Sequence, residues 1–317
     1  MSLRKERAEN TTAQRWLQIR QEYRAVFVAT LRSSAAWFFC AVLLIAIGLL
    51  LLRGREDLIA GNLPFLVLVL IFALLTIPLT SHVRQLAPIE THCSRSQLWW
   101  QVALLLIIIL FVTYRAAVFS QPGTFHIPFL YALVYWTINF LGPGNLFANW
   151  IAVPVLYFVL PVIVLLLLGA RWSETGLGRG YHGWRVALLW SLLPLVGLGL
   201  FLILGIASLR IILIRAANNF FQNGFFEEFL FRGALMTRLS YLLSSDWGLV
   251  LSTLIFGLFH TGTQTQSLGG DWLAGAASAI VSQAVLGLGF AIIFARTRNL
   301  LASSVFHVIL DTFGSFT

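Results

Sequence analysis

The sequence predicts an all-α integral membrane protein: a polytopic transmembrane helix bundle of about nine or ten apolar segments, preceded by an N-terminal amphipathic helix. Of its 317 residues, 59% are hydrophobic and only 10% are charged, and the mean hydropathy is +0.86. Because a water-soluble domain carries about 25% charged residues, this chain lacks the polar side chains to cover a surface in water. Its apolar residues also gather in runs close to the roughly 20 residues that a spanning helix needs.

Residues 1–34 form a basic segment that differs from the rest of the chain. Trp16, Ile19, Tyr23, Phe27 and Leu31 recur at steps of three and four residues, which predicts an amphipathic helix lying on a membrane surface. Seven Lys and Arg residues in the same segment favour a cytoplasmic location against anionic lipid. We therefore attribute the net charge of +9 to contact with membrane lipid and expect no nucleic-acid partner.

Polar connections, prolines and glycines divide the remaining chain into apolar runs. We expect helices over Ala35–Leu52, Leu63–Leu79, Leu98–Val118, Ile127–Leu141, Trp150–Leu168, Arg185–Ile214, Asn219–Leu243, Trp247–His260, Trp272–Ala295 and Leu300–Phe316. The run Ile127–Leu141 is short and ends at the breaker Gly142-Pro143-Gly144, so it either spans the membrane or re-enters it. A polar loop follows residue 170, with Glu174 and His182 expected to be solvated. This loop divides the N-terminal transmembrane helices (35–170) from a predicted catalytic membrane core (171–317).

Two cysteines are present, Cys40 in an apolar run and Cys93 in a polar connection. They do not form a spaced framework, so we expect free thiols that take no part in a metal site.

The last four runs hold the ionisable residues on which a functional interpretation depends. Glu227, Glu228 and Asp311 lie inside apolar runs, and His260 and His307 lie at the end of or within neighbouring runs. An ionised group in a spanning segment costs several kcal/mol unless it is paired, hydrated or bound to an ion. If these runs pack as an antiparallel series, all five residues reach a similar depth near one face. Each residue alone could be an ion pair, a helix cap or an interhelical hydrogen bond, but their common depth favours an active site.

The spacing of these residues suggests a division of roles. Residues four apart share a helix face, which aligns Glu228 with Arg232, Phe256 with His260 and His307 with Asp311. Glu227 points about 100° away from Glu228, so one arrangement pairs Glu228 with Arg232 and leaves Glu227 facing the histidines. Two histidines and carboxylates can hold a divalent metal such as Zn²⁺, or they can position a water directly. A carboxylate beside that water can act as a general base in either case.

These three motifs resemble those of a known family. Glu227-Glu228-x-x-x-Arg232, Phe256-x-x-x-His260 and His307-x-x-x-Asp311 are similar, in order, to the motifs of the CPBP family of intramembrane proteases, which includes the type II CAAX prenyl endopeptidases. The resemblance covers about Arg171 to Thr317. It implies an intramembrane endopeptidase that hydrolyses a peptide bond of a membrane-associated, lipidated or leader-bearing substrate.

The resemblance also implies residue roles. Glu227 is expected to activate water with His260 as its partner, and His307 with Asp311 to position water or stabilise the oxyanion. Glu228 and Arg232, with Phe256 nearby, are expected to support the site or bind substrate. Eukaryotic family members commonly carry Asn where this chain has Asp311, and the carboxylate could ligate a metal but would repel an oxyanion unless it is protonated. The family is usually labelled metalloprotease, while a metal-free glutamate mechanism has also been argued, so Zn²⁺ held by His260, His307 and Asp311 stays open.

Two other classes of function fit the composition. Intramembrane Glu, His and Asp could form the proton relay of a transporter, but that class expects repeats in both halves, and these residues cluster in one. A non-catalytic immunity or binding protein could retain the motifs for stability.

We expect the protein to lie in a bacterial cytoplasmic membrane. The charge distribution leaves its orientation open, and the sequence does not determine its oligomeric state. Ten spans would place both termini and the active face in the cytoplasm, but would leave five arginines outside: Arg171, Arg179, Arg185, Arg296 and Arg298. If Ile127–Leu141 does not span, those five lie inside and the active face opens outward. We favour the ten-span form.

Overall fold

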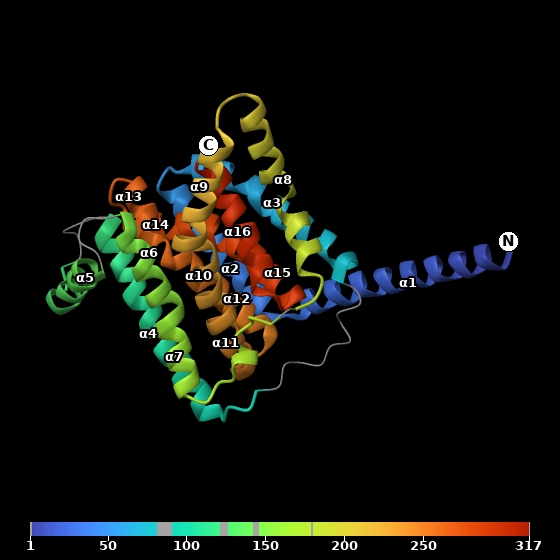
Figure 1. The fold of residues 1–317 in the computed structure, drawn as a ribbon, viewed down its shortest axis with the longest axis horizontal. Coiled ribbons are helices and arrows are strands. Elements are labelled where there is room, and N and C mark those ends of the chain that lie inside the picture. The colour runs from blue at the N-terminus through green and yellow to red at the C-terminus, as the bar shows by residue number, and fades with distance from the viewer. Residues whose placement is uncertain (1, 81–90, 121–125, 142–145, 179, 317) are drawn as a thin grey trace.

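The computed structural model describes the chain except for residues 1, 81–90, 121–125, 142–145, 179 and 317, and the side-chain surroundings of 1–13 and 138–149. Arg179 and the breaker at 142–144 lie outside the described residues. Every regular element in the described part is a helix (Figure 1). The α-helices are α1 Ser2–Arg32, α2 Ser34–Leu52, α3 Glu56–Thr80, α4 Arg95–Ser120, α5 Pro128–Leu141, α6 Leu146–Pro154, α7 Leu160–Leu167, α8 Gly183–Ile203, α9 Leu209–Asn219, α10 Phe225–Glu228, α11 Thr237–Leu242, α12 Ser245–Phe259, α13 Thr261–Ser267, α14 Trp272–Ala279, α15 Val285–Thr297 and α16 Leu300–Gly314.

π-helical turns join several of these helices into longer rods. The turns are Val155–Val159 between α6 and α7, Phe220–Gly224 and Phe229–Met236 on either side of α10, and Ile280–Ala284 between α14 and α15. Within the described part of the chain, six of the resulting helices are long and apolar enough to cross a membrane: Ser34–Leu52, Glu56–Thr80, Arg95–Ser120, Trp150–Leu167, Gly183–Ile203 and Trp272–Thr297. The shorter apolar helices α12 and α16 lie among them. The prediction of an all-α, multi-pass integral membrane protein is confirmed.

The C-terminal helices form the centre of the bundle. Of the most apolar window in α14–α15, 72% is buried inside the protein, against 6% in α3 on the periphery. Residues Phe229–Met236 are buried without exception. Large apolar side chains such as Leu44, Leu74 and Ile107 point outward instead, as expected for helices whose outer face meets lipid rather than water. The N-terminal helices therefore surround a core built from the segment that carries the three motifs.

The run expected as one helix, Arg185–Ile214, is two helices with a turn between them. Gly205 lies in the turn with φ +70°, a left-handed conformation that glycine adopts without steric strain. Ser208 then caps α9, its side chain accepting a hydrogen bond from the Ile211 amide. The expectation of one helix starting near Asn219 is corrected as well, because α9 continues through α10 to Leu242. A turn this short, between two apolar stretches, leaves the hydropathy of the run almost unchanged.

Contacts between the connections define two ends of the bundle. At one, which we call the α1 end, Arg296 pairs with Glu22 at 2.6 Å and donates to Thr80 at 2.9 Å. Gln101 near the start of α4 donates to the carbonyl of Leu168 just after α7, at 3.0 Å. At the opposite α13 end, four contacts join the other helix termini: Arg53 with Asp271, Trp150 with Asn218, Arg215 with Ser315, and Asn219 with Thr312.

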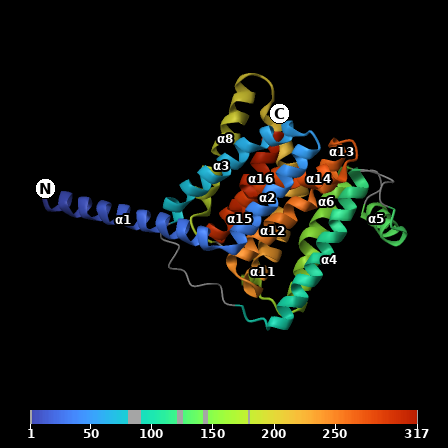
Figure 2. The same ribbon diagram turned by 180° about the vertical axis from the view of Figure 1, so that it is seen from behind.

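These contacts correct the ten-span expectation. α4 runs from the α1 end to the α13 end, where Ala117 contacts Gly262, and the α6–α7 rod starts at that same end, where Trp150 bonds Asn218. The intervening α5 does not cross from the α13 end to the α1 end. Both ribbon views show it outside the bundle, beside α4 and α6 (Figures 1 and 2). Nine segments of the described chain therefore cross the bundle: α2, α3, α4, α6–α7, α8, α9–α11, α12, α14–α15 and α16.

Glu174 is also corrected, because it is buried rather than solvated. Its carboxylate is 2% exposed, pairs with the fully buried Arg238 at 3.2 Å, and accepts a hydrogen bond from the His92 amide at 3.3 Å. This pair ties two connections at the α1 end to the central helix. Cys40 and Cys93 are free thiols, as expected.

Candidate active site

The two glutamates lie in a helix whose backbone departs from the regular α form. α10 holds Glu227 and Glu228 between two π-helical turns, Phe220–Gly224 and Phe229–Met236. Such turns insert a residue into the helical repeat, re-aim the neighbouring side chains, and are frequent at functional sites. Both carboxylates are buried in this helix, although ionised groups of this kind are found in apolar surroundings only when something compensates them.

Glu228 is compensated by a buried ion pair and a histidine. Arg232 Nη1 donates to Glu228 Oε1 at 3.0 Å, and both side chains are fully buried. Arg232 also donates to the Gly287 carbonyl at 2.8 Å, and its guanidinium lies 4.3 Å from the centre of the Phe256 ring. His307 Nδ1–H donates to the same Glu228 oxygen at 3.1 Å, since an ionised carboxylate can only accept. Because Nδ1 is engaged by Glu228, Nε2 is the His307 nitrogen that faces Glu227 and Asp311.

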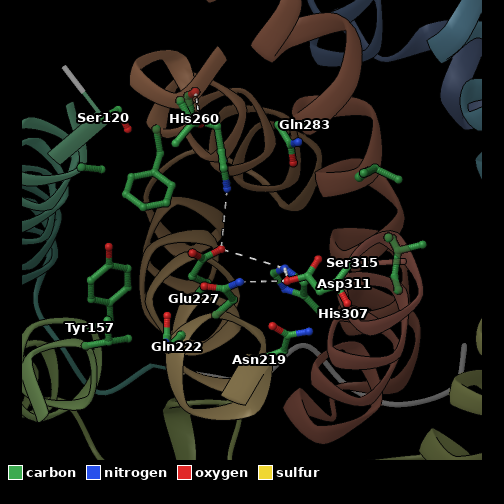
Figure 3. A pocket seen from close by; sticks show the side chains of 18 of the residues that line it. Ser120, Tyr157, Asn219, Gln222, Glu227, His260, Gln283, His307, Asp311 and Ser315 are labelled. Atoms are coloured by element: carbon green, nitrogen blue, oxygen red, sulfur yellow. Dashed lines mark hydrogen bonds and ion pairs between the residues drawn. The ribbon is translucent and has the colours of Figure 1, made fainter. Parts of the chain in front are cut away.

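Glu227 turns toward the two histidines instead. Its Oε2 atom stands 4.0 Å from His260 Nε2 and 4.0 Å from His307 Nε2, and has no hydrogen-bond partner among the described residues. The Phe256 carbonyl accepts a hydrogen bond from His260 Nδ1–H at 3.0 Å, so the neutral ring presents an unprotonated Nε2 toward Glu227. Figure 3 shows the Glu227 carboxylate between the two histidines.

Asp311 completes the group on its more open side and is 30% exposed. Its Oδ2 atom lies 3.6 Å from His307 Nε2 and accepts a hydrogen bond from Asn223 Nδ2 at 3.0 Å. Sequence reasoning did not assign Asn223 to the site, although its position four residues before Glu227 places both on one helix face and could have revealed it. All five residues proposed as catalytic from the sequence are thus brought together, with Arg232 and Phe256 behind them.

A cavity of about 770 Å³ lies in front of these residues. Glu227, His260, His307 and Asp311 line it on the side of the central helices. The opposite wall comes from helices outside the three motifs: Phe65 of α3, Arg115, Ala116, Phe119 and Ser120 of α4, and Val153 and Tyr157 around the following rod. The motifs therefore supply the polar centre, whereas the N-terminal helices shape the space around it.

The donor atoms match zinc in kind and, between His307 and Asp311, nearly in spacing. Nitrogen and carboxylate oxygen are normal zinc ligands, and both histidines donate Nδ1–H to an acceptor, as metal-bound histidines do. Ligand atoms of a tetrahedral zinc with 2.0–2.1 Å bonds lie about 3.4 Å apart. His307 Nε2 and Asp311 Oδ2 are 3.6 Å apart, whereas Glu227 Oε2 is 4.0 Å from each histidine nitrogen. Among the described residues no group of three His, Cys, Asp or Glu side chains is arranged to hold a metal. The 4.0 Å separation between Glu227 Oε2 and each histidine Nε2 leaves room for a water molecule that bridges them.

Comparison with known proteins identifies the segment that holds the motifs. Residues 208–313 match the family model described as "Rce1-like: Type II CAAX prenyl endopeptidase Rce1-like". No curated protein and no solved structure matches the chain. The matched segment contains every motif residue and supports a protease, hence hydrolase, role for this multi-pass membrane protein. Residues 208–313 of this chain are thus similar to the Rce1-like type II CAAX prenyl endopeptidases, in agreement with the resemblance that the three motifs indicated.

Proposed function

We propose that this protein is an intramembrane endopeptidase in which Glu227 activates a water molecule for attack on a peptide bond. The observation that carries the proposal is the position of Glu227 Oε2, a buried acceptor without a hydrogen-bond partner in the described structure, 4.0 Å from His260 Nε2. A water that donates one hydrogen to each of these atoms, at about 2.8 Å, fits that separation with an angle near 90°. Its oxygen lone pairs then face the cavity.

The remaining residues supply the other parts of a hydrolysis. Glu227 takes a proton from the water as its oxygen bonds to the carbonyl carbon, and later gives that proton to the leaving amine. Protonated His307, held by Glu228 on one nitrogen and Asp311 on the other, donates Nε2–H to the oxyanion. Asp311 is itself engaged by Asn223 and His307, which offsets the repulsion that a bare carboxylate would exert. In this mechanism Asp311 is a positioning residue that acts through His307.

The proposed substrate is an extended peptide from a membrane-associated protein, and the cavity supports this proposal. Its size and its mixed lining, with Phe65, Phe119 and Leu310 beside Asn219 and Gln222, suit several residues of a peptide whose anchor stays in lipid. Zinc would act here as a Lewis acid if it were bound by His260, His307 and Asp311, and metal analysis separates that form from the water mechanism.

Cleavage of membrane-anchored fluorogenic peptides by the purified protein in detergent tests the proposal. We expect Glu227→Gln to lower kcat by at least ~10²–10⁴-fold, because the variant keeps the shape of the side chain but removes the proton acceptor. The Tm should stay the same or rise slightly, because the change neutralises a buried charge whose cationic neighbour, His307 at 4.0 Å, is already paired with Glu228 and Asp311. Glu174→Gln is the matched control, a change of the same type at a buried site outside the cavity, and should retain its kcat. Wild-type cleavage by Glu227→Gln would exclude Glu227 as the base.

A further inference from the structure

Basic residues are distributed unequally between the two ends of the bundle. Seven lie in α1, and five more stand at helix termini of the α1 end: Arg95, Arg171, Arg185, Arg296 and Arg298. Among the described residues, the α13 end carries four at or beside helix termini, Arg53, Arg55, Arg210 and Arg215, and Arg115 lies five residues before the end of α4. Lys and Arg near the ends of spanning helices accumulate on the cytoplasmic side of a membrane, and acidic residues count little in this rule. The charge distribution therefore places the α1 end in the cytoplasm.

The contacts of α1 support the same orientation. Its Glu22 pairs with Arg296 and its Tyr23 donates to the Leu74 carbonyl, so the second half of the helix is fixed against the bundle. Trp16 and Phe27 remain mostly exposed on it. The basic helix thus extends sideways from the α1 end (Figures 1 and 2), where it can lie on an anionic cytoplasmic leaflet.

The cavity lies at the α13 end of the bundle. Its lining includes Ser120, the last residue of α4, Thr263 of α13, and Gly314 and Ser315 at the end of α16. No described lining residue comes from a connection of the α1 end. At about 1.5 Å per residue along α16, Asp311 lies only about 5 Å below the helix end at Gly314. The catalytic group is therefore close to the α13 surface.

We propose that the active site opens to the non-cytoplasmic side of the membrane and takes its substrates from that side. Building on the proposed endopeptidase, the substrate class is a peptide segment exposed on, or exported to, the outer leaflet and held there by a membrane anchor. A cytoplasmic lipidated tail would meet the α1 end, whose described connections contribute no residue to the cavity lining. The orientation follows from α5 remaining on one side, because one fewer crossing moves four described arginines to the side of α1: Arg171, Arg185, Arg296 and Arg298.

Cysteine labelling in the membrane tests the orientation without any need for activity. In the full chain with Cys40→Ala and Cys93→Ala, one new cysteine replaces an exposed serine at each end: Ser267→Cys in α13 and Ser245→Cys at the start of α12. We expect a membrane-impermeant maleimide to label Ser267→Cys in spheroplasts and Ser245→Cys only in inverted vesicles. Native Cys93, retained in a Cys40→Ala chain, reports on the α1 end without a new substitution and should behave like Ser245→Cys. The reverse pattern overturns the proposal.

Proteoliposomes test the substrate side. A lipid-anchored fluorogenic peptide is added to the outside of intact proteoliposomes. Before detergent is added, its cleavage rate should be proportional to the fraction of protein molecules whose residue 267 is labelled from outside. Proportionality to residue 245 would overturn the proposal. Loss of all cleavage in detergent would instead count against the endopeptidase function, while the labelling would still decide the orientation.

Discussion

Replacing Glu228 by Gln removes one charge from a fully buried ion pair, and the structure indicates how large the effect should be. Glu228 Oε1 accepts from both Arg232 and His307, at 3.0 and 3.1 Å, where no water reaches. Breaking a buried pair by neutralising one partner typically costs about 3–5 kcal/mol, because the other charge stays uncompensated. Arg232 keeps its hydrogen bond to the Gly287 carbonyl and its contact with the Phe256 ring. We therefore expect a loss near the lower limit, about 3 kcal/mol.

A second buried pair provides the matched control. Glu174 and Arg238 have the same chemistry, a similar separation of 3.2 Å and nearly the same burial, but they lie outside the cavity lining. Glu174→Gln should destabilise the protein by a similar amount, about 3 kcal/mol, at unchanged kcat. Glu228→Gln should lower kcat as well, since His307 loses the charged acceptor that fixes its ring. The double variant Glu228→Gln with Arg232→Gln should recover most of the stability but not the activity.

SDS titration in mixed micelles, followed by circular dichroism, gives the free energies of unfolding of these three variants and of Glu227→Gln. Cleavage rates measured in the same detergent give their activities. The reasoning is refuted if Glu228→Gln unfolds at the wild-type SDS fraction, or if the double variant is no more stable than the single one. A folded, inactive Glu228→Gln beside a fully active Glu227→Gln would reverse the roles given to the two glutamates.

Two further predictions concern Asp311 and the metal. Asp311→Asn keeps an oxygen that can accept hydrogen bonds from Asn223 and His307, so its kcat should stay within about tenfold of wild type. Asp311→Ala removes that oxygen and should lower kcat by about 10–100-fold at a similar Tm. Equal losses of kcat in the two variants would exclude positioning through these contacts. Cleavage should survive exhaustive chelation in protein that elemental analysis shows to lack zinc, because among the described residues no three His, Cys, Asp or Glu side chains are arranged to hold a metal. Stoichiometric zinc that disappears together with activity in His260→Ala would contradict this expectation.

The sequence alone determined the class of fold and the residues of the polar centre. Hydropathy and the 3.6-residue repeat are local properties, so they show which segments are apolar helices and which side chains share a face. Glu227 and Glu228 stood out because an acidic residue within an apolar run contrasts with its neighbours in the chain. Asn223 lies on the same face as Glu227 but was not assigned, since a neutral amide in such a run attracts less attention than a charge.

Only the tertiary structure decided which of these residues touch and which side of the bundle they face. Glu174 seemed solvated because its neighbours in sequence are polar, whereas its burial depends on Arg238, 64 positions away. Likewise, the local pattern of Ile127–Leu141 does not distinguish a crossing helix from α5. That distinction depends on where α4 ends and where the next rod begins, which are contacts between distant segments. Long-range packing of this kind leaves no periodic trace in the sequence, yet it fixes the number of crossings, the cavity wall from α4 and the side on which the site opens.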